Sequence, residues 1–128
     1  ALGYSLYKNK KTICIDGDGS LLMHLGSIKT IGTFSKNNLK YILLNNNCHD
    51  SVGGQKTYSD DIEFEKLSKS LGFKSFISIK NKKNLEKKLK KFLKQDKLSF
   101  LEVRVSNSKI KKLPRPSNLI KIKNEFMK

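Results

Sequence analysis

The chain has 128 residues, and its 27 Lys and Arg outnumber its 11 Asp and Glu, for a formal charge of +16. This length is sufficient for one domain with a substantial core, and no apolar run approaches the roughly 20 residues that a membrane-spanning helix needs. No signal peptide is evident, and two cysteines are too few for a disulfide framework, so we expect a cytoplasmic protein. Because the chain opens on Ala1 in a helix-like stretch, we also expect it to be part of a longer polypeptide.

The positive charge makes nucleic-acid binding an alternative to be weighed, because clustered Lys and Arg neutralise phosphates. Only 7 of the 27 basic residues lie in residues 1–60. Most of the others are lysines in residues 80–97 and after Lys109, without interleaved aromatic residues. This distribution disfavours a nucleic-acid module, which we keep as an alternative from a different functional class.

Four apolar segments are typical of β-strands, at residues 12–16, 39–44, 73–79 and 99–105. The first is nearly all apolar, which predicts a strand covered on both faces. In the last, Leu101, Val103 and Val105 are expected on one side. The segment 45–59, rich in Asn, Gly, Ser and Asp, is predicted to be a long functional loop.

Helical spacing of apolar residues predicts the intervening helices. The first helix should stop near Gly32, and its apolar residues are Leu21, Leu22, Leu25, Ile28 and Ile31. The second should be capped by Asp60 or Asp61 and end at Gly72, and its apolar residues are Phe64, Leu67 and Leu71. The third should carry an apolar stripe of Leu85, Leu89, Phe92 and Leu93. After Asn107 the chain is expected to be irregular through Pro114-Arg115-Pro116, followed by a short helix over 119–127.

This alternation predicts an α/β fold, a doubly wound and mostly parallel sheet with helices on both faces and right-handed crossovers. Ligands of such sheets bind beyond the carboxyl ends of the strands. We expect residues 1–128 to form a single domain, with 107–128 as a C-terminal extension.

Two polar clusters follow neighbouring strands at that expected edge. Gly17-Asp18-Gly19-Ser20 comes directly after the first strand, and Asn45-Asn46-Asn47 follows the second. The two glycines allow a phosphate close to the backbone, and the helix behind Ser20 offers free amides to an anion. The Asp18 carboxylate and the Asn46 amide are hard oxygen donors of the kind that Mg²⁺ prefers, and the Cys48 carbonyl could complete the set.

Either cluster alone is more often a simple turn than a metal site. Asp18 and Asn46 are 28 residues apart, however, which is the separation that a βαβ unit requires to bring two strand ends together. The combination is therefore far more specific than its parts.

Gly17-Asp18-Gly19 with Asn45-Asn46 resembles the cofactor motif of the pyrophosphate-type domain of thiamine diphosphate enzymes. The segments Asp16 to Gly26, His49-Asp50-Ser51-Val52-Gly53-Gly54-Gln55-Lys56-Thr57, Leu113 to Ser117 and Asn124 to Met127 further resemble the phosphonopyruvate decarboxylase family. The likeness spans essentially the whole chain and is most discriminating at His49 to Gln55. The β subunits of sulfopyruvate decarboxylases and of 2-oxoacid:ferredoxin oxidoreductases have related loops and remain alternatives.

The resemblance implies thiamine diphosphate and Mg²⁺ as cofactors, with Asp18, Asn46 and the Cys48 carbonyl as metal ligands. It places Gly17, Gly19, Ser20 and His49 around the diphosphate, and Gly53, Gly54 and Gln55 in a loop closing over cofactor and substrate. Asn47 and Lys56 depart from the family pattern, where Gly and Pro are common. Asn47 should be tolerated because Asn readily adopts positive φ, and Lys56 adds a cation near the loop.

The implied reaction converts 3-phosphonopyruvate to phosphonoacetaldehyde and CO₂, a step of phosphonate biosynthesis. The activating glutamate is expected outside this chain, on a pyrimidine-binding domain of the same or a neighbouring subunit, within a homo-oligomer. The isolated chain should then be inactive. His24 is interpreted as a packed or partly exposed residue and Cys14 as a small core residue, neither of them catalytic. A domain that has lost its cofactor is a further alternative.

Overall fold

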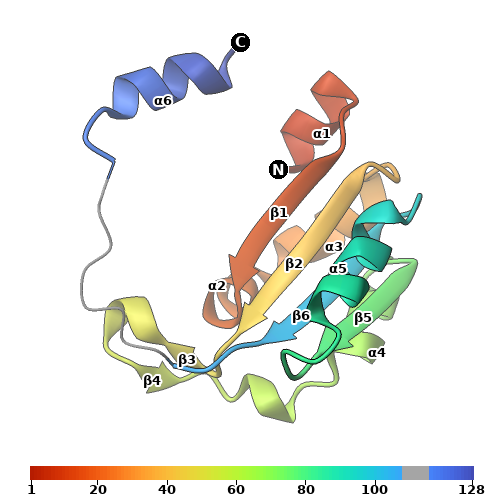
Figure 1. Cartoon of the computed structure of the whole chain (residues 1–128), viewed down its shortest axis with the longest axis vertical. Coiled ribbons are helices and arrows are strands. Elements are labelled where there is room, and N and C mark those ends of the chain that lie inside the picture. The colour runs from red at the N-terminus through yellow and green to blue at the C-terminus, as the bar shows by residue number, and fades with distance from the viewer. Residues whose placement is uncertain (108–115) are drawn as a thin grey trace.

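A computed structural model describes residues 1–107 and 116–128 (Figure 1). Its main sheet has four parallel strands in the order β1-β2-β6-β5. They are β1 (Thr12–Gly17), β2 (Leu39–Asn45), β5 (Ser75–Ile79) and β6 (Ser99–Arg104). A small antiparallel hairpin of β3 (Cys48–His49) and β4 (Gln55–Lys56) lies within the predicted loop. The four predicted strands and the α/β class are confirmed.

Helices connect the strands and cover both faces of the sheet (Figure 1). They are α1 (Leu2–Lys8), α2 (Asp18–Met23), α3 (Leu25–Phe34), α4 (Phe64–Ser70), α5 (Leu85–Lys94) and α6 (Leu119–Phe126), with the 3₁₀ turns η1 (Asp50–Val52) and η2 (Ser59–Asp61). None of the helices in the described ranges is long and apolar enough to cross a membrane.

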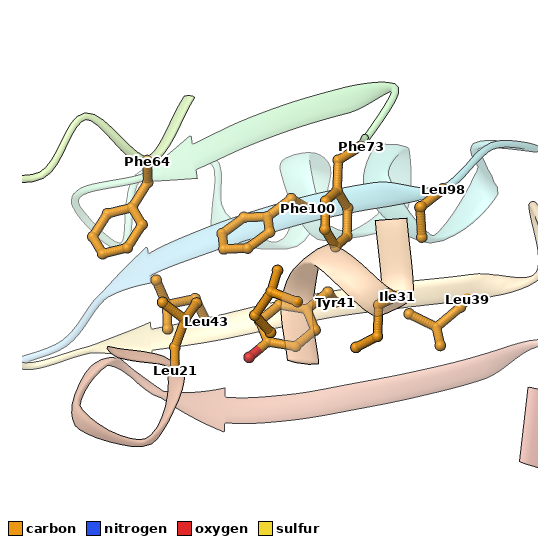
Figure 2. Close-up of a cluster of buried hydrophobic side chains, with 10 residues drawn as sticks. Leu21, Ile31, Leu39, Tyr41, Leu43, Phe64, Phe73, Leu98 and Phe100 are labelled. Carbon is orange, nitrogen blue, oxygen red and sulfur yellow. The ribbon is translucent and has the colours of Figure 1, made fainter. Parts of the chain in front are cut away.

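The larger core lies on the face covered by α2, α3 and α4, where aromatic residues stack (Figure 2). Phe100, in β6, is its centre, with its ring 5.1 Å from that of Tyr41 and 5.2 Å from that of Phe73, centroid to centroid. On the opposite face Phe92 of α5 packs with Ile42 and the other members of a smaller cluster. Leu89 and Leu93 pack against this cluster as predicted, whereas Leu85, the first residue of the predicted stripe on α5, is 38% exposed and lies outside it.

Strand β1 is not covered on both faces, so that part of the prediction is wrong. Ile13 is 47% exposed and Ile15 64% exposed. Ile15 pairs with Ile42 and faces the same side of the sheet, but β1 is the edge strand and the α5 cluster is built on β2, β5 and β6. The face of β1 that carries Ile13 and Ile15 is therefore exposed because α5 does not extend over it.

The first predicted helix is divided in two at His24, which sequence spacing did not indicate. The His24 amide is shared between the carbonyls of Ser20 and Leu21, each 3.2 Å away, and its φ of −126° is not helical. The second part, α3, also runs past Gly32, the expected stop, and ends at Phe34.

The start of α4 differs from the prediction as well. Asp60 and Asp61 belong to η2, and the N-cap position of α4 is Glu63, without a side-chain capping bond. Gly72 does follow the helix as expected, with φ of 110°. The predicted irregular segment through Pro114-Arg115 falls largely outside the described residues, whereas the expected terminal helix is present as α6.

Candidate functional site

The carboxyl ends of β1 and β2 lie side by side, because Gly17 pairs with Leu44 in the parallel register. Asp18 follows immediately as the first residue of α2, and Asn45 ends β2. The two polar clusters therefore meet at one edge of the sheet, as their spacing predicts.

Asp18 is 1% exposed, unusually little for a carboxylate, and is held by two hydroxyls. Its Oδ2 accepts hydrogen bonds from Thr57 and, at 3.0 Å, from Ser59. Across the described ranges no hydrogen bond is made to its other oxygen, Oδ1. Asp18 thus has one fixed oxygen and one with free acceptor capacity.

Ser59 joins the two strand ends through a single hydroxyl. Its Oγ lies 2.7 Å from Asn45 Oδ1, 3.0 Å from Asp18 Oδ2 and 3.2 Å from Asn47 Oδ1. A serine has one proton and can donate it to only one of these oxygens at a time. Acceptor oxygens therefore outnumber hydroxyl protons at this point, an arrangement that favours a nearby cation.

Asn45 is buried and oriented from the centre of the sheet. Its Nδ2 donates to Glu102 Oε1 at 3.0 Å, which turns its Oδ1 toward Ser59 and the amide of Asn47. Glu102, itself 4% exposed, also accepts from Ser78 at 3.0 Å and pairs with Arg104 at 2.7 Å. A buried hydrogen-bonded chain thus runs from β5 and β6 to Asp18.

Asn46 and Cys48 form the rim beside Asp18. Asn46 Oδ1 accepts from the Cys48 amide at 3.2 Å, and its Nδ2 donates to Asp50 at 3.0 Å. Asn47 between them has φ of 59°, in agreement with the conformational tolerance predicted for it. Cys48 is buried, and the pKa of its thiol is raised by burial and by the nearby Asp50 carboxylate. Cys48 can therefore contribute its carbonyl while its thiol stays protonated.

A pocket of about 510 Å³ opens over this rim. Its lining includes seven of the predicted site residues, namely Gly17, Asp18, Gly19, Ser20, Asn46, Cys48 and His49, with Met23, Leu44, Val52 and Val105 as apolar walls. Gly53, Gly54 and Gln55 are exposed at the β3–β4 hairpin and do not line it. The structure therefore brings most of the predicted site together and leaves the predicted closing loop outside.

His49 lies directly over Gly19. A Cβ added at Gly19 would lie 2.3 Å from His49 Nδ1, a distance that real Cβ atoms do not show. Any larger residue at position 19 would therefore displace the imidazole. This contact gives a specific steric reason for the glycine after Asp18.

The oxygens at this edge fit a hard divalent cation. In the described part of the chain no three His, Cys, Asp or Glu residues are grouped as metal ligands. A metal here would therefore depend on one carboxylate together with amide and carbonyl oxygens, which are donors that Mg²⁺ accepts. Asp18, Asn46 and the Cys48 carbonyl supply that combination, and phosphate oxygens and water would complete an octahedral shell.

Asp16, in the same motif as Asp18, has a separate role. Its Oδ2 accepts the Tyr41 hydroxyl proton at 2.5 Å, and it lines a different pocket of about 330 Å³ with Cys14 and His24. Cys14 is half-buried beside the core, and burial raises the pKa of its thiol. The His24 side chain is exposed, and its non-catalytic role stays a prediction.

Sequence reasoning missed Thr57, Ser59 and Glu102. Thr57 and Ser59 lie 39 and 41 residues from Asp18 in a loop without periodicity, and Glu102 sits in an otherwise apolar strand. The only available signal was Glu102 itself, because a charged residue inside the predicted strand of residues 99–105 indicates that it has a buried partner.

Comparison with known proteins decides the family. The model of the family described as thiamine pyrophosphate enzyme, C-terminal TPP binding domain, matches residues 1–103. The chain belongs to the thiamine pyrophosphate enzyme family. Thiamine pyrophosphate and thiamine diphosphate are two names of one cofactor, so the resemblance found in the motif is confirmed at the level of the family.

Relatives of this thiamine pyrophosphate domain carry two different names. The chain is 30% identical to a phosphonopyruvate decarboxylase of Streptomyces viridochromogenes, over 90% of this chain and 29% of that protein. It is 40% identical to a sulfopyruvate decarboxylase subunit beta of Methanothermobacter thermautotrophicus, over 56% of this chain and 39% of that subunit. A Methanococcus maripaludis subunit beta is 33% identical over 98% of this chain and 67% of its own length. The chain thus spans under a third of the first relative's length.

Solved structures agree with the fold of this family. A putative thiamin diphosphate-dependent enzyme of Mycobacterium smegmatis matches with a TM-score of 0.62 at 18% identity, covering 82% of this chain and 20% of that one. A transketolase of Campylobacter jejuni matches with a TM-score of 0.55, also at 18% identity, over 74% of this chain and 15% of that one. At this identity the likeness supports the fold alone.

Proposed function

We propose that this chain supplies the diphosphate- and metal-binding half of a thiamine diphosphate-dependent 2-oxo acid decarboxylase. The single observation that supports this assignment most is the arrangement of Asp18, a buried carboxylate with one oxygen held by Thr57 and Ser59 and the other without a recorded partner in the described residues. It lies on the wall of a pocket large enough for a diphosphate.

The proposed division of roles follows from that geometry. Asp18, Asn46 and the Cys48 carbonyl hold Mg²⁺. Gly17, Gly19, Ser20 and His49 surround the diphosphate, with His49 oriented over Gly19 and able to donate a charge-assisted hydrogen bond. The exposed Gly53, Gly54 and Gln55 would approach the site only when cofactor and substrate are bound. The bound cofactor would supply an electron sink for the pair released with CO₂, while the protein orients it and excludes water.

Two acids are candidate substrates of the proposed enzyme. The first is 3-phosphonopyruvate, which would give phosphonoacetaldehyde and CO₂, as the relative of Streptomyces viridochromogenes is named for this acid. The second is sulfopyruvate, favoured by the relative that aligns with nearly the whole chain. Both are 2-oxo acids with a second anionic group. The remaining half of the site, with the activating glutamate, would come from a pyrimidine-binding domain of the same polypeptide or of a partner subunit in an oligomer.

The test is Mg²⁺-dependent binding of thiamine diphosphate to the complete enzyme that contains this chain. We expect Asp18→Ala to weaken binding by at least about a hundredfold, because it removes the charged metal ligand. Ser59→Ala, which removes only the hydroxyl beside that ligand, should cost about 10–100-fold in metal affinity. Asp60→Ala is the matched control, since Asp60 is exposed in η2.

Equal affinities in the Asp18→Ala and Asp60→Ala enzymes would refute the metal assignment. Turnover of phosphonopyruvate and of sulfopyruvate by the unmodified enzyme would then be compared. A ratio of kcat/KM values far from one identifies the substrate, and no turnover of either acid rejects both proposed substrates.

A further inference from the structure

A second pocket, of about 400 Å³, lies at the carboxyl edge of β5 and β6. Its lining comprises Ile79, Lys80, Asn81, Lys82, Leu85, Val103, Arg104, Val105 and Ser106. Val105 also lines the pocket over Asp18, so the two hollows adjoin. This pocket is therefore placed beside the site proposed for the cofactor and at the edge of the sheet where ligands of this fold bind.

The guanidinium of Arg104 is fixed at the wall of this pocket. Its Nε pairs with Glu102 Oε1 at 2.7 Å, and Glu102 is itself held by Asn45 and Ser78, each at 3.0 Å. The Arg104 side chain is only 30% exposed. Within the described ranges its two terminal nitrogens make no hydrogen bond, so the forked end of the side chain is oriented and still able to donate.

The charge of the pocket is positive. Lys80 and Lys82 are exposed at its rim, directly after β5, and none of the described residues that line it carries a carboxylate. The Glu102 carboxylate behind the wall offsets one of the three positive charges. A cluster of cations around a concave surface attracts anions and raises their local concentration.

We propose that Arg104, Lys80 and Lys82 form a binding site for the second anionic group of the substrate, a phosphonate or sulfonate carried by a 2-oxo acid. This inference rests on the proposed function and assigns its substrate class. An oriented guanidinium matches the paired oxygens of a tetrahedral anion, and the lysines act as mobile point charges. An acid without a second anionic group, such as pyruvate, would leave this site unused.

The direct test needs no catalysis. Methylphosphonate and methanesulfonate are titrated by calorimetry into the complete enzyme, with and without thiamine diphosphate. We expect saturable binding that persists in the cofactor-loaded enzyme, weakened at least tenfold by Arg104→Gln and several-fold by Lys80→Gln or Lys82→Gln. Lys74→Gln, which removes an exposed lysine before β5 at the opposite edge of the sheet, should bind like the unmodified enzyme.

Absence of binding to the unmodified enzyme, or equal binding by the Arg104→Gln and Lys74→Gln enzymes, would overturn the proposal. Loss of anion binding only after thiamine diphosphate is added would assign the pocket to the cofactor's own diphosphate and would also overturn it.

Kinetics then relate the site to the reaction. In the complete enzyme Arg104→Gln should raise KM for the dianionic substrate at least tenfold, with a smaller effect on kcat and on the affinity for thiamine diphosphate. Arg104→Lys should restore part of the loss, and KM for pyruvate should stay within twofold. Uniform loss for all substrates would indicate a structural role only. An enzyme that binds methylphosphonate but not thiamine diphosphate would instead refute the proposed function and leave the anion site standing.

Discussion

Asp16 and Asp18 lie two residues apart in one short motif, yet their surroundings give them different roles. The Asp16 carboxylate accepts the Tyr41 hydroxyl, and its Oδ1 accepts the amide of Gly17, so it fixes the end of β1. Asp18, the first residue of α2, instead meets the hydroxyls of Thr57 and Ser59, which hold one of its oxygens. The carboxylate that we propose as a metal ligand is therefore the one that the structure leaves with spare acceptor capacity.

Gly19→Ala should affect cofactor binding through His49. The added methyl would overlap the imidazole, so we expect His49 to shift and the affinity for thiamine diphosphate to fall by about tenfold, about 1.4 kcal/mol. Gly3→Ala in α1, where a Cβ meets no atom within 4 Å, serves as control. Unchanged affinity in both enzymes would show that the position of the His49 ring is immaterial for binding.

Tyr41 should make stability fall at high pH. Burial, and then the hydrogen bond to Asp16, raise the pKa of Tyr41 far above its ordinary value. The unfolded chain loses this proton near pH 10 whereas the folded chain keeps it, so the stabilisation is complete below about pH 10 and declines above it. Tyr41→Phe should remove this decline and cost about 1–2 kcal/mol near neutrality, because Asp16 loses a donor.

Lys40 changes folding stability with pH in the opposite direction, so its contribution has to be measured separately from that of Tyr41. Its ammonium is buried and donates to the carbonyls of Asn37, at 3.1 Å, and Lys97, yet burial lowers its pKa. Stability from this group therefore rises as pH increases toward the ordinary lysine pKa, near 10.4. Urea titrations of the Tyr41→Phe and Lys40→Met chains from pH 8 to 11 give the free energy of unfolding at each pH and so separate the two contributions. If this free energy changed with pH in the same way for the unmodified and the Tyr41→Phe chains, the role given to Tyr41 would be contradicted.

At the scale of the elements, two glycines allow α3 to lie against the turn between α4 and β5. A Cβ at Gly32 would lie 1.7 Å from the Leu71 carbonyl oxygen, and one at Gly72 would lie 2.7 Å from the Gly32 carbonyl oxygen. Gly72 also has φ of 110°, which other residues rarely adopt. Gly32 therefore lies inside α3 and allows close contact with the turn between α4 and β5, although its position in the sequence is typical of a residue that ends a helix.

Either Gly32→Ala or Gly72→Ala should destabilise the chain by several kcal/mol. For Gly72 the backbone strain alone amounts to about 1–3 kcal/mol, and the steric overlap adds to it. Gly26→Ala, in the same helix as Gly32 but with open space around it, should instead stabilise by about 0.5–1 kcal/mol. Chemical denaturation of the three variants checks this ordering, and a Gly32→Ala chain as stable as Gly26→Ala would disprove the close packing.

At the scale of the whole molecule, the strand order concentrates the polar residues at one edge. β6 inserts between β2 and β5, which pairs Arg104 with Asn45 and brings Ser78 opposite Glu102. The pockets over Asp18 and beside Arg104 thereby adjoin. At the other side of the sheet the exposed Ile13 and Ile15 mark an apolar surface on β1.

The isolated 128-residue chain should not turn over phosphonopyruvate or sulfopyruvate. No glutamate is among the described residues that line the pocket over Asp18, and the proposed reaction needs one beside the pyrimidine ring. A coupled assay of the purified chain should give background rates, whereas the complete enzyme should be active under the same conditions. Mg²⁺-dependent turnover by the chain alone, abolished by Asp18→Ala, would contradict this expectation.

Much of the fold could be predicted because its signals are local. Apolar runs place the four strands, helical spacing places α5 and α6, and the separation of Asp18 and Asn46 indicates one shared edge. The break at His24 and the start of α4 at Phe64 could not be predicted in this way, since competing backbone hydrogen bonds decide both. The prediction that both faces of β1 are covered was wrong. An apolar segment looks the same in the sequence whether its strand is covered on both faces or lies at an exposed edge of the sheet.

By itself, the sequence determined the class of fold and the two loops that carry the candidate site, since both follow from residue type and spacing along the chain. Only the tertiary structure decided which side chains support them. Ser59 meets Asp18, and Glu102 meets Asn45, across 41 and 57 residues. The physical reason is that a buried polar group must find hydrogen-bond partners wherever the chain brings them, and strand order rather than sequence distance sets that choice.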